Sequence, residues 1–286
     1  MKRTATPSHR TQTIRIAAAV SLFCWVASII TKDTSWVDRL WSIVPAVYVW
    51  VFAVAALVAG EDATRLVVMA VLVTAWGARL TFNFARKGGY TGMEDYRWAI
   101  LRARMSPAQF QLFNVFFIVL YQNALLVLIS LPALIAWQNP TPFTGWDAAF
   151  AALFVLFLAG EFIADQQQWD FHKAKHAAGG TLEPGFLTTG LWRYSRHPNF
   201  FFEQAQWWAF YALGATAAVT AGAGLWGGAI NWTIIGAALL TVLFIGSTVF
   251  TESISASKYP EYTQYQRTTS MLVPLPPRQR PAEANA

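Results

Sequence analysis

Residues 110–137 read FQLFNVFFIVLYQNALLVLISLPALIAW and contain no charged side chain. A helix needs roughly 20 mostly apolar residues to cross about 30 Å of hydrocarbon, so this stretch is long enough to span a bilayer. Further apolar blocks occur on both sides of it, at residues 14–30, 40–60, 65–84, 146–164, 200–222 and 232–250. The pattern predicts an all-α, multi-pass integral membrane bundle of about seven transmembrane helices.

The composition of the whole chain agrees with a membrane protein. Of its 286 residues, 55% are hydrophobic and only 13% are charged, whereas soluble domains carry about 25% charged residues. Soluble nucleic-acid binders, secreted disulfide scaffolds and disordered chains are thereby excluded. The single cysteine, Cys24, forms no intrachain disulfide. The net charge of +6 indicates basic loops that face anionic lipid headgroups.

The domain organisation follows from the position of the apolar blocks. We expect an N-terminal tail at 1–13, a single membrane domain at 14–275 and a disordered tail at 276–286. The first block is interpreted as a span rather than a signal peptide, because no cleavage-site pattern follows it. Most of the 21 lysines and arginines lie after the first, third and fifth spans or in the C-terminal tail. The positive-inside rule then predicts a cytoplasmic C-terminus, although the basic N-terminal tail opposes this orientation.

Two stripes of polar residues lie within or at the ends of these spans, where such residues are costly and often functional. Helical spacing places each stripe on one helix face; the first contains Trp76, Arg79, Asn83 and Arg86, and the second contains Glu161, Asp165 and Gln168. The arginines would attract an anionic cofactor or headgroup, or simply extend to the membrane surface. The neighbouring carboxylates call for a cation or for hydrogen-bond donors, such as ribose hydroxyls or an amide.

The densest polar segment is GLWRYSRHPNFFFEQ, residues 190–204. Pro198 suits the first turn of a helix, where its missing N–H costs nothing. Such a helix would align Asn199, Glu203 and Gln206 on one face. The segment therefore predicts a polar site at the start of a membrane helix.

Basic and aromatic side chains surround this predicted site. Arg193, Arg196 and His197 lie near the helix N-terminus, which favours anions, and guanidinium groups suit a phosphate. Further along, KYPEYTQYQR at 258–267 contains Tyr262 and Arg267. These side chains would stack on and bind a nucleotide, or else anchor the chain in the membrane interface.

Two other patterns are set aside. Residues 222–227, GAGLWG, match the dinucleotide-binding spacing of glycines but follow a membrane span rather than a strand. His172 and His176 have metal-ligand spacing, but no third ligand lies nearby in the sequence, so we expect no metal.

Taken together, several motifs resemble the steroid 5α-reductase superfamily, and most closely its uncharacterised bacterial branch. The motifs are SWVDRLW (35–41), WGARL (76–80), EDYR (94–97), Asp165, GLWRYSRHPN (190–199) with Glu203, and the tyrosine-rich segment 258–267. The match runs in order from about residue 31 to 275. It implies a seven-helix fold in the bacterial inner membrane that holds NADPH from the cytosolic side, mainly through residues 160–275. It implies cofactor-binding roles for Arg79, Arg86, Asp165, Arg196, His197, Asn199, Glu203, Tyr262 and Arg267.

The sequence departs from that superfamily in three respects. Trp76 stands where the steroid reductases have a tyrosine, and an indole cannot deliver a proton, so Tyr96 and Asp38 become the candidate catalytic acids. The Gln-Glu pair that grips a 3-keto group is missing. Phe200 and Phe202 replace the tyrosine and glycine that are usual in the bacterial branch.

The expected function is therefore an NADPH-dependent ene-reductase that acts on a lipophilic enone, such as a sterol or an isoprenoid. Hydride would pass from the nicotinamide to the β-carbon, and a general acid would protonate the α-carbon. Expected partners are the lipophilic substrate and membrane lipids, with no nucleic acid. An S-adenosylmethionine-dependent membrane methyltransferase is the alternative, with Glu252, Tyr262 and Tyr265 matching its downstream glutamate and tyrosine pair. A transporter or structural membrane protein is the non-enzymatic alternative.

Overall fold

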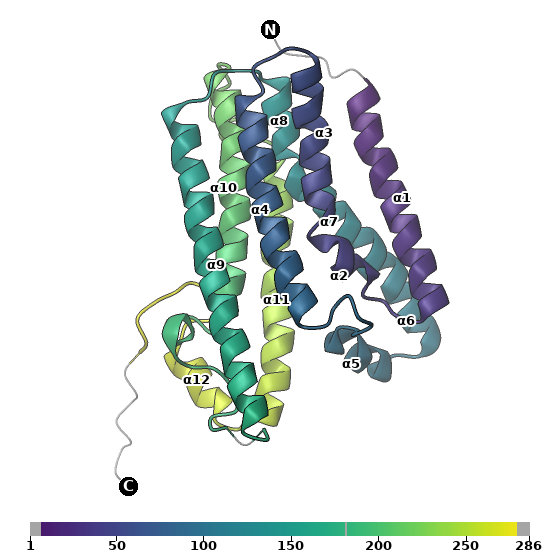
Figure 1. Cartoon of the computed structure of the whole chain (residues 1–286), viewed down its shortest axis with the longest axis vertical. Helices are drawn as coiled ribbons and strands as arrows, with labels where there is room; N and C mark the ends of the chain where they lie inside the picture. Colours follow the sequence, from purple (N-terminus) through teal and green to yellow (C-terminus); the bar gives the residue numbers. More distant parts are fainter. Residues whose placement is uncertain (1–6, 181, 279–286) are drawn as a thin grey trace. The chain divides into compact units, whose positions relative to one another are not determined.

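The computed structural model describes residues 7–180 and 182–278, and this part of the chain contains helices but no strand (Figure 1). Among these residues, twelve α-helices follow one another, with a π-helix, η1, and a 3-10 helix, η2, between them. In chain order they are α1 (Pro7–Thr31), α2 (Trp36–Trp41), α3 (Val44–Val58), α4 (Thr64–Arg86), α5 (Tyr96–Arg104), α6 (Pro107–Phe113), η1 (Asn114–Tyr121), α7 (Gln122–Ser130), α8 (Pro132–Gln138), α9 (Gly145–Ala177), η2 (Gly190–Arg193), α10 (Pro198–Thr220), α11 (Ile234–Lys258) and α12 (Tyr262–Thr268).

Six helical segments among the described residues are long and apolar enough to cross a membrane. They are Thr11–Thr31, Trp36–Val58, Thr64–Arg86, Pro107–Gln138, Gly145–Ala177 and Ile234–Lys258. The predicted block at 200–222 also forms a long helix, α10, which carries Glu203, Gln204 and Gln206 in its first half and is not one of these six. The prediction of an all-α, multi-pass membrane bundle is confirmed.

The helical boundaries differ from the expected ones at the N-terminus. α1 already begins at Pro7, so residues 7–13 of the predicted N-terminal tail are helical. Residues 1–6 of that tail, and residues 279–286 of the predicted C-terminal tail, lie outside the described part of the chain.

The chain divides into two compact units. The first contains the described residues up to Ala152 together with Trp208–Leu239, and the second contains Leu153–Trp207 and the described residues from Leu240 onward. The expected cofactor-binding half at 160–275 overlaps the second unit, but its residues 208–239 belong to the first unit.

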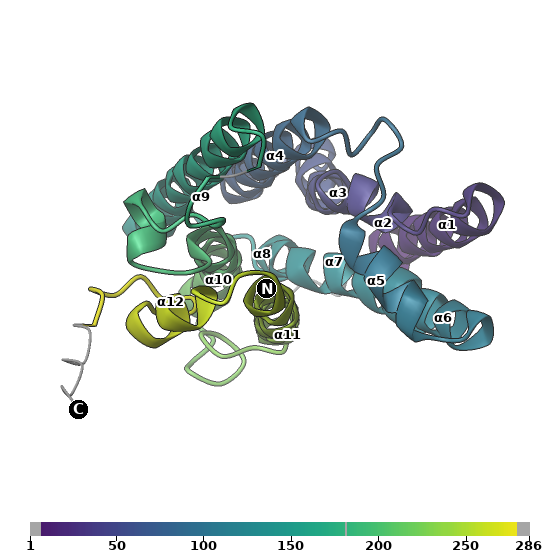
Figure 2. The same ribbon diagram turned by 90° about the horizontal axis from the view of Figure 1, so that it is seen from below.

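Within the first unit, α3 packs along α4 (Figure 2). Gly77 makes this close approach possible, because a Cβ at this position would collide with the carbonyl oxygen of Ser42. Tyr48 and Phe52 of α3 and Met69 and Trp76 of α4 are fully buried in the unit. Large apolar side chains on two facing helices therefore supply much of its core.

Within the second unit, α9 and the beginning of α10 also approach closely at a glycine. A Cβ built on Gly160 would lie 2.7 Å from the ring of Phe202. The missing side chain of Gly160 therefore leaves the space that the Phe202 ring occupies. This contact brings the polar face of α10 against that of α9 and positions the site described next.

Candidate functional site

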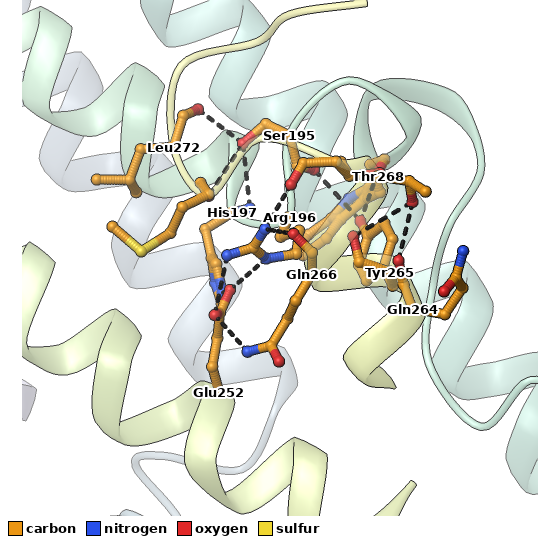
Figure 3. Close-up of polar contacts among 12 residues, drawn as sticks. Ser195, Arg196, His197, Glu252, Gln264, Tyr265, Gln266, Thr268 and Leu272 are labelled. Atoms are coloured by element: carbon orange, nitrogen blue, oxygen red, sulfur yellow. Dashed lines mark hydrogen bonds and ion pairs between the residues drawn. The ribbon is translucent and has the colours of Figure 1, made fainter. Parts of the chain in front are cut away.

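Arg196 lies in the second unit and connects η2 and α10 to α11 and the C-terminal segment (Figure 3). Its guanidinium donates from Nε to Glu252 Oε1 at 2.6 Å and from Nη2 to Glu252 Oε2 at 3.0 Å. Its Nη1 donates to the carbonyl oxygens of Gln266, at 2.9 Å, and Thr269. Both charged side chains are buried. The guanidinium that the sequence assigns to a cofactor phosphate is thus directed toward protein acceptors.

His197 and Gln266 complete this cluster around the Glu252 carboxylate. His197 Nε2 lies 3.1 Å from Glu252 Oε1, and Gln266 Nε2 donates to Glu252 Oε2 at 2.8 Å. The His197 ring stacks on Phe200, with ring centroids 5.5 Å apart. We call Arg196, His197, Glu252 and Gln266 the Glu252 cluster. It places the R-H-P motif against the C-terminal segment, from which it is far in sequence.

Backbone contacts attach the C-terminal segment to residues 194–196. The Arg196 N–H donates to Ser270 O at 2.8 Å, the Ser195 hydroxyl donates to Leu272 O at 2.7 Å, and the Leu275 N–H donates to Tyr194 O at 2.9 Å. The C-terminal segment is therefore part of the same structure as the R-H-P motif.

Tyr262 and Tyr265 pack against the ring of Phe186, with ring centroids 5.0 Å and 5.5 Å away. The Tyr265 hydroxyl also donates to the carbonyl oxygen of Trp192. Burial raises the pKa of both phenols well above their ordinary value. Tyr262, predicted to contact the cofactor, is buried among aromatic rings, whereas Arg267 of the same helix is exposed.

Two carboxylate–carboxamide pairs join α9 to α10. Asn199 donates from Nδ2 to Asp165 Oδ1 at 3.3 Å. Gln206 donates from Nε2 to Glu161 Oε2 at 2.6 Å. Glu161, Asp165 and Gln206 are buried, and so is Glu203, which lies between the two amides on α10. The structure thus pairs Asn199 with Asp165, and Glu203 lies one helical turn beyond Asn199 on α10. The cofactor-binding roles of these three residues remain predictions.

The carbonyl oxygens of both amides are buried without a hydrogen-bond partner. Among the described residues, no group donates to Asn199 Oδ1 or to Gln206 Oε1. Buried polar atoms are nearly always paired, so two unpaired acceptors on one helix face indicate a site for a ligand that carries donors. The described residues contain no cluster of His, Cys, Asp or Glu suited to a metal ion.

The arginine stripe belongs to α4 in the first unit. Trp76, Arg79 and Asn83 are buried, and Arg86 donates from Nε to Asn83 Oδ1 at 2.9 Å. The Arg86 guanidinium also lies over the Phe82 ring. The shared helix face predicted from the spacing is therefore present, while the cofactor-binding roles of Arg79 and Arg86 remain predictions.

The two candidate acids also belong to the first unit and occupy different environments. Asp38 accepts a hydrogen bond from Trp98 Nε1 at 2.9 Å, whereas the Tyr96 side chain is 53% exposed. Glu94 joins the segment before α2 to the segment around α5. Its carboxylate accepts hydrogen bonds from the backbone N–H of Thr34 and from the Arg102 guanidinium. The sequence motifs at 35–41 and 94–97 thus meet in a hydrogen-bonded network.

Several residues have roles that the sequence pattern does not predict. The pattern assigns Glu252 only to the methyltransferase alternative, although a carboxylate in an apolar span is a signal in itself. The sequence pattern does not indicate the roles of Gln266 and Phe186, because their partners are distant in sequence. Arg65, the first residue of the predicted span 65–84, forms a buried ion pair with Asp147 in the first unit.

Comparison with known proteins names neither the steroid 5α-reductase superfamily nor an activity. Residues 24–269 match a family model described as a protein of unknown function, DUF1295. The chain is 40% identical over 266 residues to an uncharacterised protein of Schizosaccharomyces pombe, a match that covers 87% of this chain and 75% of that protein. No solved structure matches the chain. Because the family model matches most of the chain, from residue 24 to residue 269, the chain belongs to the DUF1295 family.

Proposed function

We propose that the protein is an NADPH-dependent ene-reductase that reduces a carbon–carbon double bond conjugated to a carbonyl in a lipophilic substrate. One observation carries the proposal: two buried carboxylate–carboxamide pairs on α9 and α10 leave the acceptors Asn199 Oδ1 and Gln206 Oε1 without donors among the described residues. A nicotinamide nucleoside carries donors of the matching kind, namely ribose hydroxyls and a carboxamide NH₂. The residues present therefore fit the cofactor that the resemblance implies.

Each part of the site has a distinct task in this proposal. Asp165 and Asn199 bind ribose hydroxyls, because a carboxylate and an amide oxygen both accept hydrogen bonds. The exposed guanidinium groups of Arg193 and Arg267 attract the phosphates; they lie on η2 and α12, which the Tyr265 hydroxyl joins. When bound, NADPH would supply a hydride to the substrate.

The Glu252 cluster positions the C-terminal segment and does not itself bind the cofactor. Arg196 makes four hydrogen bonds to protein acceptors, so its task is to hold the C-terminal segment and α12 against η2. Burial of the acidic pairs excludes water and strengthens their hydrogen bonds with a ligand. Hydride chemistry benefits from such an environment, since water is kept from the reacting atoms.

The methyltransferase remains the second candidate, because Glu252 contacts the R-H-P motif through His197 at 3.1 Å. S-adenosylmethionine carries a sulfonium and an ammonium cation, which buried carboxylates would also attract. For either enzyme we propose that the second unit's site faces the cytoplasm together with the C-terminus, in the inner membrane if the source is a bacterium. The lipophilic substrate would then enter from the bilayer.

Ligand-induced stabilisation of the detergent-purified chain separates the two candidates. A ligand that binds only the folded state at a hundredfold excess over its Kd adds about 2.7 kcal/mol of stability. We expect NADPH to raise Tm, and S-adenosylmethionine to leave Tm unchanged. Stabilisation by S-adenosylmethionine alone would replace the reductase by the methyltransferase, and stabilisation by neither would remove both.

Variants locate the site of binding. Asp165→Ala and Asn199→Ala should abolish stabilisation by NADPH while the chain still elutes as a folded species. Asp170→Ala is the matched control, since Asp170 lies on the same helix but is exposed. Unchanged affinity in both site variants would exclude the α9–α10 site.

A further inference from the structure

Gln206 presents one hydrogen-bonding atom whose identity the structure fixes. The side chain is completely buried, and its Nε2 donates to Glu161 Oε2 at 2.6 Å and to the backbone oxygen of Phe202 at 3.2 Å. A backbone carbonyl oxygen accepts but never donates, so the NH₂ group must face Phe202. The atom left over, Oε1, is therefore an acceptor, and only an N–H or O–H donor satisfies it.

Asn199 repeats this arrangement nearer the start of α10. Its NH₂ group faces Asp165, and its Oδ1 is buried without a partner among the described residues. In both pairs a carboxylate on α9 orients an amide on α10. The site is thus built to present two acceptors rather than to neutralise charge.

The two acceptors lie at different depths along the helices. Asn199 and Gln206 are seven residues apart on α10, and their partners Asp165 and Glu161 are four residues apart on α9. With a rise of 1.5 Å per residue, the pairs are separated by about 6 to 10 Å along the helix axes. A single ligand must therefore carry one donor near the end of the helix and a second donor deeper inside.

We propose that Gln206 Oε1 accepts a hydrogen bond from the carboxamide NH₂ of the nicotinamide ring, and that Glu161 is the positioning residue that fixes this acceptor. The inference rests on the proposed function and assigns the deeper pair to the base and the outer pair to the ribose. Gln206 would then distinguish a carboxamide from a group of the same shape that cannot donate. Neither Gln206 nor Glu161 is among the cofactor-binding residues that the family resemblance implies.

Binding measurements with two nucleotides test this assignment without any turnover. The full chain in detergent is titrated with NADP⁺ and with its 3-acetylpyridine analogue, in which a methyl group replaces the NH₂. Wild type should bind NADP⁺ roughly tenfold more tightly than the analogue, since tenfold corresponds to one hydrogen bond of ordinary strength. Gln206→Met should weaken binding of NADP⁺ to the level of the analogue and bring the ratio of the two Kd values close to one.

A neighbouring glutamine supplies the matched control. Gln204 is also buried on α10, but its amide donates to the Phe200 carbonyl of its own helix. Gln204→Met should keep the tenfold ratio. The double variant Glu161→Gln/Gln206→Met also removes the buried charge that Gln206→Met leaves without its amide donor. It should bring the ratio close to one as well, which covers the case that Gln206→Met alone fails to fold.

The outcomes separate this inference from the proposed function. Binding of NADP⁺ with equal affinity for the analogue in wild type overturns the role of Gln206 but leaves the reductase standing. A tenfold ratio that persists in Gln206→Met also overturns that role. Absence of any binding of NADP⁺ or NADPH to wild type overturns both.

Discussion

The carboxylate of Glu252 on α11 and the guanidinium of Arg196 before α10 form a two-point ion pair, with N–O distances of 2.6 Å and 3.0 Å. The Arg196 and Glu252 side chains are only 9% and 7% exposed. Such a pair is geometrically specific but expensive to break, because each charge has lost its hydration. Its main consequence is structural: it attaches the C-terminal segment to the R-H-P motif.

Removal of the Glu252 charge should therefore destabilise the second unit. Glu252→Gln leaves a buried guanidinium without its counter-ion, and we expect a loss of about 3 kcal/mol in the free energy of unfolding. Denaturant titration in detergent micelles measures this loss. Glu261→Gln changes an exposed carboxylate on the neighbouring turn and should cost less than about 0.5 kcal/mol. Equal effects of the two substitutions would show that the ion pair contributes nothing.

A second buried ion pair, between Arg65 and Asp147, should behave as a coupled unit. The distances are 2.8 Å for both N–O contacts, and Arg65 also donates to Thr141 and Pro142. Arg65→Met alone should cost about 3 kcal/mol, because Asp147 remains buried and charged. The double variant Arg65→Met/Asp147→Leu should cost clearly less than the sum of the two single variants. Additive losses in denaturant titrations would contradict the pairing.

The spans are predictable because length and hydropathy are local properties. A run without charges, such as residues 110–137, specifies a membrane helix whatever it packs against. The spacing of Asn199, Glu203 and Gln206 likewise predicts that they share one helix face, since this depends only on the helical repeat. The pairing of Asn199 with Asp165 follows only from the resemblance, because periodicity does not reveal which helix is the neighbour.

Partners of the charged residues are harder to anticipate. The sequence assigns Arg196 to a phosphate because basic groups at a helix N-terminus attract anions. Its local pattern contains no information on Glu252, which lies 56 residues further along and reaches the same point only through the fold. The unusual Phe202 is explained by Gly160, whose missing side chain leaves room for the ring.

The pH dependence of stability should contain a contribution from Glu94. Burial would raise the pKa of its carboxyl, but hydrogen bonds from Arg102 and Thr34 outweigh burial and hold the pKa below its usual value. The contribution is therefore present above about pH 4.3 and is lost as the pH falls through the lower, folded-state value. Because the Arg102 side chain is 40% exposed, solvent screens the pair, and Glu94→Gln should cost only about 1 kcal/mol at pH 7.

Unfolding of wild type and Glu94→Gln at neutral and acidic pH checks this expectation. The difference between the two proteins should shrink toward zero below the folded-state pKa, where Glu94 is protonated. Glu183→Gln, which changes an exposed carboxylate, is the control and should show little difference at either pH. If the difference in unfolding free energy between the two proteins grew on acidification, the pKa of Glu94 would be raised by folding rather than lowered. That result would contradict the assigned contacts.

The contact between Gly160 and Phe202 should limit what can replace either residue. Gly160→Ala places a methyl group 2.7 Å from the Phe202 ring, so α9 and α10 must separate or the ring must move. We expect a loss of about 1–3 kcal/mol in stability, as for other overpacked sites. The double variant Gly160→Ala/Phe202→Leu should recover part of this lost stability.

Gly246→Ala on α11 is the control. It introduces the same methyl group into open space and should cost no stability, since alanine is a better helix former than glycine. If Gly160→Ala were as stable as Gly246→Ala, the close approach of α9 and α10 would not depend on this glycine.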